Sequence, residues 1–403
     1  MPISTSIAAM MQNSSFIRKM FEEGSKLKML HGVDAVCDFS IGNPDMTPPQ
    51  EFQAALMEEA GRQEPRIHGY MPNAGYPYVR KNVADFASSE QGVELTAQNL
   101  LMTCGAGGAL NVALRAIVNP GDEVLASAPC FVEYGFYCGN YGAELKLVPS
   151  TDTFDLNPKV FAEAVTEKTA AVIINSPHNP TGRIYPSETL AELAEVLDEA
   201  SRRIGRRIYL LSDEPYRKIA YDGIEVPSVM AVYPHSLVAT SYSKDLSVPG
   251  ERIGYLAVSP GADDAEQLIG ALTLCNRILG YVNAPGLMQR TVARLQGVSV
   301  DVGVYQAKRD KLRAILDDAG FEYAEPQGTF YFWVKSPVDD ELAVVDALKK
   351  ELILTVPGRG FSGPGWFRIS YCVDDAVIER SAEGFKTVRK QFPSQPNPPL
   401  ERT

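Results

Sequence analysis

Residues 100–127 read LLMTCGAGGALNVALRAIVNPGDEVLAS, and this stretch decides the class of fold. Its first four residues are apolar and lead into a glycine-rich turn, after which leucine and isoleucine recur at helical spacing. An Asn-Pro-Gly-Asp run ends that helix, and the last five residues read as a second strand. A strand, a helix and another strand in succession are typical of an α/β domain with a mostly parallel sheet.

The same alternation continues downstream. A helix is expected over residues 187–204, with Gly205 as its stop. Open α/β sheets bind ligands at the carboxyl ends of their strands, so polar residues that follow the strands are candidates for a site. Further strands are expected at residues 171–174, 208–211, 237–240 and 253–258.

Beyond residue 290 the regular strand–helix alternation ends, and the expected elements are typical of a smaller α+β domain. Near the amino terminus, residues 16–29 form an amphipathic stretch, expected to be a helix or an arm, and the proline-rich tail 392–403 is expected to be loosely ordered. Helices are expected at 304–319, 341–350 and 376–390, and strands at 329–334 and 367–371. The predicted division is an arm with part of the small domain (1–48), a large α/β domain (49–290) and a small α+β domain (291–403).

Bulk composition excludes several classes of protein. The 403 residues carry a formal charge of −12, which argues against a nucleic-acid partner. No apolar run approaches the ~18 residues of a membrane span. The six cysteines are scattered without a CxxC pair, and the four histidines are dispersed, so we expect reduced thiols, a cytoplasmic protein and no metal site.

The polar groups after the strands are those that pyridoxal phosphate requires. Lys244 can form an imine with its aldehyde, and Asp213 can keep the pyridine nitrogen protonated. Asn179 and Tyr216 can hold the phenolate oxygen. Each residue alone has an ordinary structural explanation, such as a surface lysine or a helix cap. Their joint occurrence, in order and at strand ends, favours the cofactor.

The phosphate dianion needs backbone N–H groups at a helix start, hydroxyls and a cation. The turn Gly105-Ala106-Gly107 supplies the backbone, since glycine lets it approach the phosphate closely. Ser241 and Ser243 supply hydroxyls, and Arg252 supplies the cation.

These motifs resemble those of the class I/II aminotransferases of pyridoxal-phosphate fold type I, over nearly the whole chain. The matching segments are 175–182 (NSPHNPTG), 213–216 (DEPY), 241–244 (SYSK) and 249–254 (PGERIG). The resemblance implies the same cofactor roles for the residues named above. It also implies that Phe131, two residues after Pro129, stacks on the cofactor ring.

The resemblance extends to the substrate and to the assembly. It implies that Arg368 binds the α-carboxylate through two parallel hydrogen bonds and that the backbone of Gly42 approaches the same group. It implies that Tyr70 reaches the phosphate of a neighbouring subunit, which requires a homodimer with shared active sites. One departure concerns Gly107, because some relatives have a hydroxyl residue there, and we expect weaker phosphate binding from its absence.

The implied activity is a ping-pong transfer of an amino group from an amino acid to a 2-oxo acid. Aligning from Lys244 places Ile278, beside Arg277, where some aspartate-specific relatives have an arginine, so aspartate or a broad range of donors is expected.

Three other classes stay open. A C–S β-lyase of the same fold is the main alternative. A pyridoxal-phosphate-fold regulator of transcription is disfavoured because no basic segment precedes the α/β region. A nicotinamide dehydrogenase is disfavoured because Leu110 stands where GxGxxG requires its last glycine.

Overall fold

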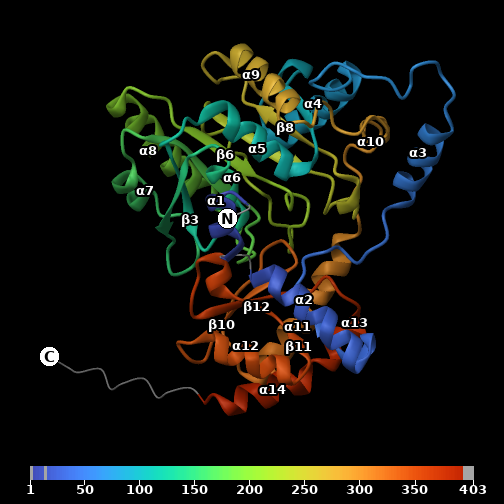
Figure 1. Ribbon diagram of the computed structural model, residues 1–403, viewed down its shortest axis with the longest axis vertical. Coiled ribbons are helices and arrows are strands. Elements are labelled where there is room, and N and C mark those ends of the chain that lie inside the picture. Colours follow the sequence, from blue (N-terminus) through green and yellow to red (C-terminus); the bar gives the residue numbers. More distant parts are fainter. Residues whose placement is uncertain (1–2, 13–15, 394–403) are drawn as a thin grey trace. The chain divides into compact units, whose positions relative to one another are not determined.

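The computed structural model describes residues 3–12 and 16–393 (Figure 1). The chain forms two compact units, which are treated separately below. The large unit comprises Asn43–Gly303 and Gln327–Thr329, and the small unit comprises Met1–Gly42, Val304–Pro326 and Phe330–Thr403. The three domain ranges expected from the sequence stay a prediction.

The large unit is built on a seven-stranded sheet of order β2-β8-β7-β6-β5-β3-β4. Strand β8 runs antiparallel to β2 and β7, and every other neighbouring pair is parallel. The expected α/β fold with a mostly parallel central sheet is therefore confirmed. The strands are β2 (Leu100–Thr103), β3 (Glu123–Ala128), β4 (Glu144–Pro149), β5 (Thr169–Asn175), β6 (Tyr209–Asp213), β7 (Ser236–Ser241) and β8 (Gly254–Val258).

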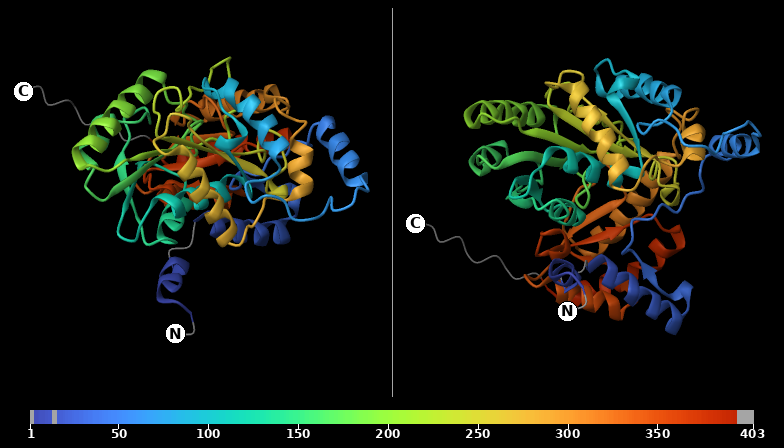
Figure 2. Two further views of the ribbon diagram at one scale, coloured as in Figure 1. Left: turned by 90° about the horizontal axis from the view of Figure 1, so that it is seen from above. Right: turned by 45° about the horizontal axis from the view of Figure 1, so that its top comes forward.

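Helices cover both faces of this sheet (Figure 2). The core cluster on one face includes α4 (Pro77–Gln91), α7 (Pro158–Ala164), α8 (Ser187–Ile204) and α10 (Gly286–Val292). Helix α3 (Gln50–Gly61) joins this cluster by packing against α10. The other face packs against α5 (Gly105–Ile117), α6 (Glu133–Gly139) and α9 (Ala265–Ile278). Two short 3₁₀ turns, η2 (Ala97–Asn99) and η3 (Pro249–Glu251), complete the unit.

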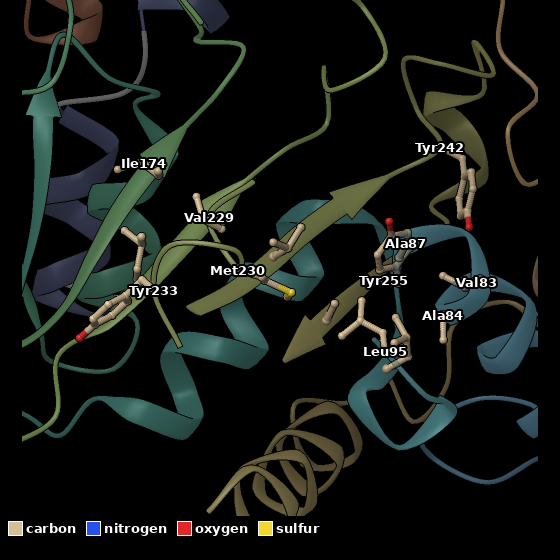
Figure 3. Packing of buried hydrophobic residues seen from close by; sticks show 14 of the residues in the cluster. Val83, Ala84, Ala87, Leu95, Ile174, Val229, Met230, Tyr233, Tyr242 and Tyr255 are labelled. Atoms are coloured by element: carbon tan, nitrogen blue, oxygen red, sulfur yellow. The ribbon is translucent and has the colours of Figure 1, made fainter. Parts of the chain in front are cut away.

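Burial on both faces explains why β5, β8 and even the edge strand β2 read as largely apolar runs. Every residue of β2, β5 and β8 is buried, as expected for strands covered by helices on both sides. Figure 3 shows part of one core cluster, in which Tyr242 and Tyr255 lie beside Val83, Ala84 and Ala87 of α4. This packing fixes the carboxyl ends of the strands in relation to the helices.

The predicted elements of the large unit are present with small differences at their ends. Helix α8 has the expected bounds, and Gly205 caps it in the left-handed conformation (φ 66°), which glycine adopts without strain. Helix α5 begins directly at the glycine-rich turn and ends at Ile117, before the Asn-Pro-Gly-Asp run.

The small unit contains two sheets, one of order β1-β11 and one of order β12-β13-β10-β9. Its strands are β1 (Cys37–Asp38), β9 (Tyr323–Ala324), β10 (Tyr331–Lys335), β11 (Ile353–Leu354), β12 (Val356–Pro357) and β13 (Trp366–Ser370). Its helices are α1 (Thr5–Gln12), α2 (Phe16–His31), η1 (Val33–Ala35), α11 (Val302–Ala319), α12 (Glu341–Lys350), η4 (Gly358–Phe361), α13 (Asp375–Arg380) and α14 (Ala382–Gln391). The expected α+β character and the helical amino-terminal stretch are confirmed.

The single helix expected at 376–390 is wrong, because the chain forms α13 and α14 with a break at Ser381. The Ser381 hydroxyl donates to the carbonyl oxygen of Ile378 (2.6 Å). The Ser381 backbone itself stays helical (φ −70°, ψ −16°), and its N–H donates to the Val377 carbonyl oxygen (3.3 Å), so the interruption is confined to one residue. Most of the proline-rich tail, 394–403, lies outside the described residues. Among the helices of the described chain, none is long and apolar enough to cross a membrane.

Candidate active site

Strand register gathers the predicted site residues of the large unit at one end of its sheet. Asn175 of β5 lies opposite Asp213 of β6, and Asp213 lies opposite Ala239 of β7. On the other side of β7, Ser241 lies opposite Gly254 of β8, which also pairs with β2 just before the glycine-rich turn.

The Asp213 carboxylate is buried at this end of the sheet and only half satisfied. The Tyr134 hydroxyl donates to Oδ2 (2.7 Å), whereas Oδ1 has no hydrogen-bond partner in the described part of the protein. Burial raises the pKa of Asp213 to about 7, while the Tyr134 hydrogen bond lowers it and nearby Glu214 raises it. A buried polar oxygen without a partner is costly, so Oδ1 is a place for a donor or cation from a ligand.

The Asn175 side chain links Asn179, another predicted site residue, to Asp213 through two hydrogen bonds. Its Nδ2 donates to the main-chain oxygen of Asp213 (2.7 Å), and its Oδ1 accepts from the main-chain N–H of Asn179 (2.6 Å). Asn179 itself is buried. One amide side chain therefore fixes the loop after β5 against the end of β6.

Lys244 and Tyr216 come from segments that follow neighbouring strands. The Lys244 amine lies 5.8 Å from the centre of the Tyr216 ring, which is itself buried. The Thr240 hydroxyl donates to the main-chain oxygen of Glu214 (2.9 Å) and so joins the two segments. Ser241, the last residue of β7, is buried here together with Ser243.

The glycine-rich turn lies beside Arg252. Gly105 has a positive φ of 72°, and a Cβ added there would stand 3.0 Å from Arg252 Nη2. A Cβ at Gly254 would overlap the main-chain oxygen of Thr240 and crowd Gly105 Cα. Glycine at position 254 thus permits the start of α5, the end of β7 and the start of β8 to meet.

The arrangement fits an anionic group at the start of α5. The first N–H groups of a helix point outward unsatisfied, and the 13-residue α5 begins with Gly105, Ala106 and Gly107. Arg252 is exposed and anchored by Nη1 to the main-chain oxygen of Pro249 (3.1 Å). Together with the half-satisfied Asp213, these groups fit a ligand that has a phosphate at one end and a ring nitrogen at the other.

Tyr134 is a site residue that the sequence reasoning missed. It lies on α6, three residues after Phe131, and the two rings meet edge to face with centroids 5.6 Å apart. The available signal was this helical spacing after the predicted stacking residue. No pattern in the sequence linked the tyrosine to Asp213, which lies 79 positions away.

In the small unit, Arg368 is held in a fixed direction. Its Nη2 donates to the main-chain oxygen of Ser40 (3.0 Å), and the guanidinium lies over the rings of Tyr331 (4.3 Å to the centroid) and Phe361 (4.7 Å). Gly42 lies close to this group, because a Cβ there would overlap the Tyr331 hydroxyl. The structure therefore brings these two predicted carboxylate-binding residues together around Tyr331.

Three residues discussed for assembly or specificity lie on the surface of the large unit. Tyr70 is 95% exposed, Ile278 at the end of α9 is 56% exposed, and Arg277 is exposed as well. Within residues 3–12 and 16–393, no group of His, Cys, Asp and Glu is placed to hold a metal ion.

Comparisons with known proteins agree with this geometry. Residues 34–385 match the family described as aminotransferase class I and II. A probable aspartate aminotransferase of Methanocaldococcus jannaschii is 30% identical over 353 residues, which cover 85% of this chain and 91% of the relative. The solved structure of an amino transferase from Eubacterium rectale is 39% identical, with a TM-score of 0.94, and the match covers 97% of this chain and 99% of that one.

An aspartate aminotransferase from Thermus thermophilus, solved with maleate, is 27% identical with a TM-score of 0.85, covering 96% of this chain and all of the other. The chain belongs to the class I and II aminotransferases. It is a pyridoxal-phosphate-dependent enzyme that moves an amino group between an amino acid and a 2-oxo acid.

Proposed function

We propose that this aminotransferase takes its amino group from aspartate, within a broader range of donors, by a ping-pong sequence. The observation that carries the cofactor assignment is Asp213, a buried carboxylate with one oxygen bonded by Tyr134 and the other available. In this proposal Oδ1 faces the protonated pyridine nitrogen, a cation that favours the ionised carboxylate.

Residues around Asp213 hold the rest of the cofactor. Asn179 and Tyr216 bind the phenolate oxygen, and Phe131 packs on the ring. The phosphate lies on the turn Gly105-Ala106-Gly107, with Ser241, Ser243 and Arg252 as further contacts. Backbone N–H groups at a helix start, hydroxyls and a guanidinium all bind a phosphate dianion favourably.

Lys244 has two roles in the proposed chemistry. Its Nζ holds the cofactor's aldehyde carbon in the resting enzyme, and the same amine later carries the α-proton, first as base and then as acid. Bound pyridoxal phosphate supplies an acceptor for the electron pair that the departing α-proton leaves behind. Asp213 keeps that acceptor effective by holding the ring nitrogen in its protonated form.

Arg368 binds the α-carboxylate of the amino acid. Its packing over Tyr331 and its bond to Ser40 leave little freedom for the guanidinium, so little conformational entropy is lost when a carboxylate binds. Gly42 brings main-chain polar groups toward the same carboxylate without a side chain in the way.

The choice of aspartate rests on the relatives. A Thermus thermophilus relative, 29% identical over 364 residues, is named aspartate/prephenate aminotransferase, and one of Thermococcus litoralis is named aromatic-amino-acid aminotransferase 2. A broader range is supported by exposed, apolar Ile278, beside which Arg277 is the nearest candidate for a side-chain carboxylate. The lyase alternative is not favoured by any of these names.

Two further properties belong to the proposal. A homodimer with shared sites is supported by the resemblance of Tyr70 to the family's tyrosine, and its side chain, 95% exposed on the single chain, is accessible to a second chain. A cytoplasmic location is supported by the six cysteines, all within the described residues, none of which forms a disulfide, as in a reducing compartment.

The decisive experiment concerns Lys244. Borohydride reduction of the purified enzyme followed by peptide mapping is expected to place the cofactor on this lysine. A Lys244→Ala variant is expected to lose turnover and the visible absorbance band. Active enzyme whose Lys244 peptide stays unlabelled would sink the assignment.

Substrate choice is tested by steady-state kinetics over a panel of amino donors with 2-oxoglutarate. Aspartate and aromatic donors are expected to react, with parallel double-reciprocal lines. Cystathionine without an acceptor is the control, and rapid release of pyruvate and ammonia from it would favour the lyase.

A further inference from the structure

The first turn of α5 has backbone donors but no side-chain donor of its own, since residues 105–108 are Gly-Ala-Gly-Gly. The space beside Gly107 is occupied by a hydroxyl from another helix. A Cβ added at Gly107 would stand 3.0 Å from Tyr137 Oη and 3.8 Å from Tyr137 Cζ. A side chain at position 107 and the Tyr137 hydroxyl therefore compete for the same space.

Helix α6 presents two tyrosines at the i, i+3 spacing that places side chains on one face. Tyr134 donates to Asp213, at the end proposed for the pyridine nitrogen. Tyr137, one turn later, reaches the glycine-rich turn, at the end proposed for the phosphate. A single short helix thus supplies a hydroxyl at each end of the proposed cofactor site.

The Tyr137 hydroxyl is suited to donate a hydrogen bond to an anion. Burial, as the main cause, and the neighbouring carboxylates of Glu133 and Asp213 raise the pKa of Tyr137 above its ordinary value, so the phenol keeps its proton. Tyr137 is half-buried, and its hydroxyl makes no hydrogen bond to another residue in the described part of the chain. Arg252 is near enough to act on it electrostatically.

We propose that the Tyr137 hydroxyl binds the phosphate of pyridoxal phosphate, as the side-chain donor that the Gly-Ala-Gly-Gly turn lacks. The proposal rests on the proposed placement of the phosphate at the start of α5. It also removes the reason to expect weak phosphate binding from glycine at position 107, since the hydroxyl comes from α6 instead.

The test separates the phosphate from the rest of the cofactor by comparing pyridoxal phosphate with pyridoxal, which lacks it. Dissociation constants are measured by absorbance or by quenching of protein fluorescence, on enzyme stripped of cofactor. In Tyr137→Phe the affinity for pyridoxal phosphate is expected to fall roughly tenfold, as for one lost hydrogen bond to a charged group. The affinity for pyridoxal is expected to stay unchanged.

Two tyrosines provide matched controls. Tyr134→Phe, on the same helix, is expected to weaken both ligands, since it acts at the ring-nitrogen end. Tyr141→Phe removes a hydroxyl that contacts Asn111 on α5 (3.4 Å), and is expected to change neither affinity. Equal weakening of both ligands in Tyr137→Phe, or no change in either, would overturn the proposal.

A second test removes the hydroxyl at Tyr137 and introduces one at position 107. Without the Tyr137 oxygen, the nearest atom to a Cβ at position 107 is the ring carbon at 3.8 Å, an ordinary contact. Adding Gly107→Ser to Tyr137→Phe is expected to recover affinity for pyridoxal phosphate, whereas Gly107→Ser alone is crowded. A folded double variant that shows no recovery would count against the proposed position of the phosphate contact.

These outcomes are distinct from failure of the proposed function. If the unsubstituted enzyme bound neither pyridoxal phosphate nor pyridoxal, the cofactor site itself would be misplaced. If it bound pyridoxal phosphate with full activity and Tyr137→Phe did the same, only the role of Tyr137 would be wrong.

Discussion

At the scale of single residues, two charged groups of the candidate site, Asp213 and Arg368, are buried away from water. Burial disfavours the ionised form of such a group. In the protein without ligand it raises the pKa of the Asp213 carboxyl to about 7. Tyr134 offsets part of this effect through one oxygen, and the other oxygen is left for a bound cation. The residue is thus arranged for its ligand and not for the stability of the empty protein.

A pH dependence of stability follows for the cofactor-free enzyme. An unfolded aspartate has a pKa of about 3.9, so between about pH 4 and 7 the folded state binds this proton more tightly than the unfolded state does. The free energy of unfolding should therefore fall as the pH rises through this window and level off above it. The contribution of Asp213 amounts to at most about 4 kcal/mol.

The measurement is urea unfolding of cofactor-free enzyme from pH 4.5 to 8, compared with Asp213→Asn. The variant cannot ionise at this position, so the unfolding free energy of the unsubstituted protein should fall relative to that of the variant as the pH rises across the window. A difference that is the same at every pH would show that the Asp213 carboxyl titrates in its ordinary range.

Arg368 supports a prediction about binding geometry. Arg368→Lys keeps the charge but loses the planar fork that binds a carboxylate through two hydrogen bonds. The value of kcat/KM for amino acids should fall by roughly 10- to 100-fold, with most of the loss in KM.

A matched control for this variant is Arg359→Lys, which alters an arginine paired with Glu341 in the same unit (2.8 Å). That variant should keep kcat/KM close to its original value. Unchanged KM in Arg368→Lys would rule out the carboxylate role.

At the scale of elements, local patterns predict the fully buried strands better than the exposed ones. Strands β5 and β8 are covered on both faces and read as apolar runs, which is why they were predicted from sequence alone. Strand β4 pairs only with β3 and has just one buried residue, so its pattern carried no such signal. The short α6 was likewise not predicted.

In the candidate site too, residues in contiguous motifs could be predicted from the sequence, whereas residues placed by tertiary packing could not. Lys244, Asp213 and Asn179 stand in contiguous motifs, so their grouping could be predicted from order along the chain. The positions of Tyr134 and of Tyr137, the proposed phosphate ligand, depend on how α6 packs against the rest of the large unit, which no local sequence pattern predicts.

Because α5, β7 and β8 pack closely around Gly254, we expect Gly254→Ala to lower the stability of the protein strongly. In Gly254→Ala the new methyl group would overlap the main-chain oxygen of Thr240 and press on Gly105 Cα. Neither neighbour is the end of a flexible side chain, so the strands must shift. The expected loss is about 2–3 kcal/mol of unfolding free energy, together with weaker binding of pyridoxal phosphate.

Gly250→Ala is the control for that change, since a Cβ at Gly250 has nothing within 4 Å. It should alter stability by less than about 0.5 kcal/mol. Thermal or urea unfolding with and without cofactor measures both effects. A stable Gly254→Ala enzyme with normal cofactor affinity would contradict the close packing of these three elements.

At the scale of the whole molecule, the proposed homodimer builds each active site from residues of two chains. Tyr70 has its ring almost entirely in solvent on the single chain, so the side chain is accessible to a second chain. A proposed homodimer would let Tyr70 of each chain contact the phosphate bound by the other. By two-fold symmetry, each active site would then contain Lys244 of one chain and Tyr70 of the other.

Mixed dimers test this sharing directly. In a dimer of one Lys244→Ala chain and one Tyr70→Ala chain, one site carries both defects, and the other has its own Lys244 and the Tyr70 of its partner intact. Co-expression in equal amounts should make about half of all dimers mixed, each with one intact site, so about a quarter of all sites in the mixture are intact. Activity at limiting pyridoxal phosphate should therefore clearly exceed the average of the two separate variants. If each site used its own Tyr70, no mixed dimer would contain an intact site, and the mixture would show only that average.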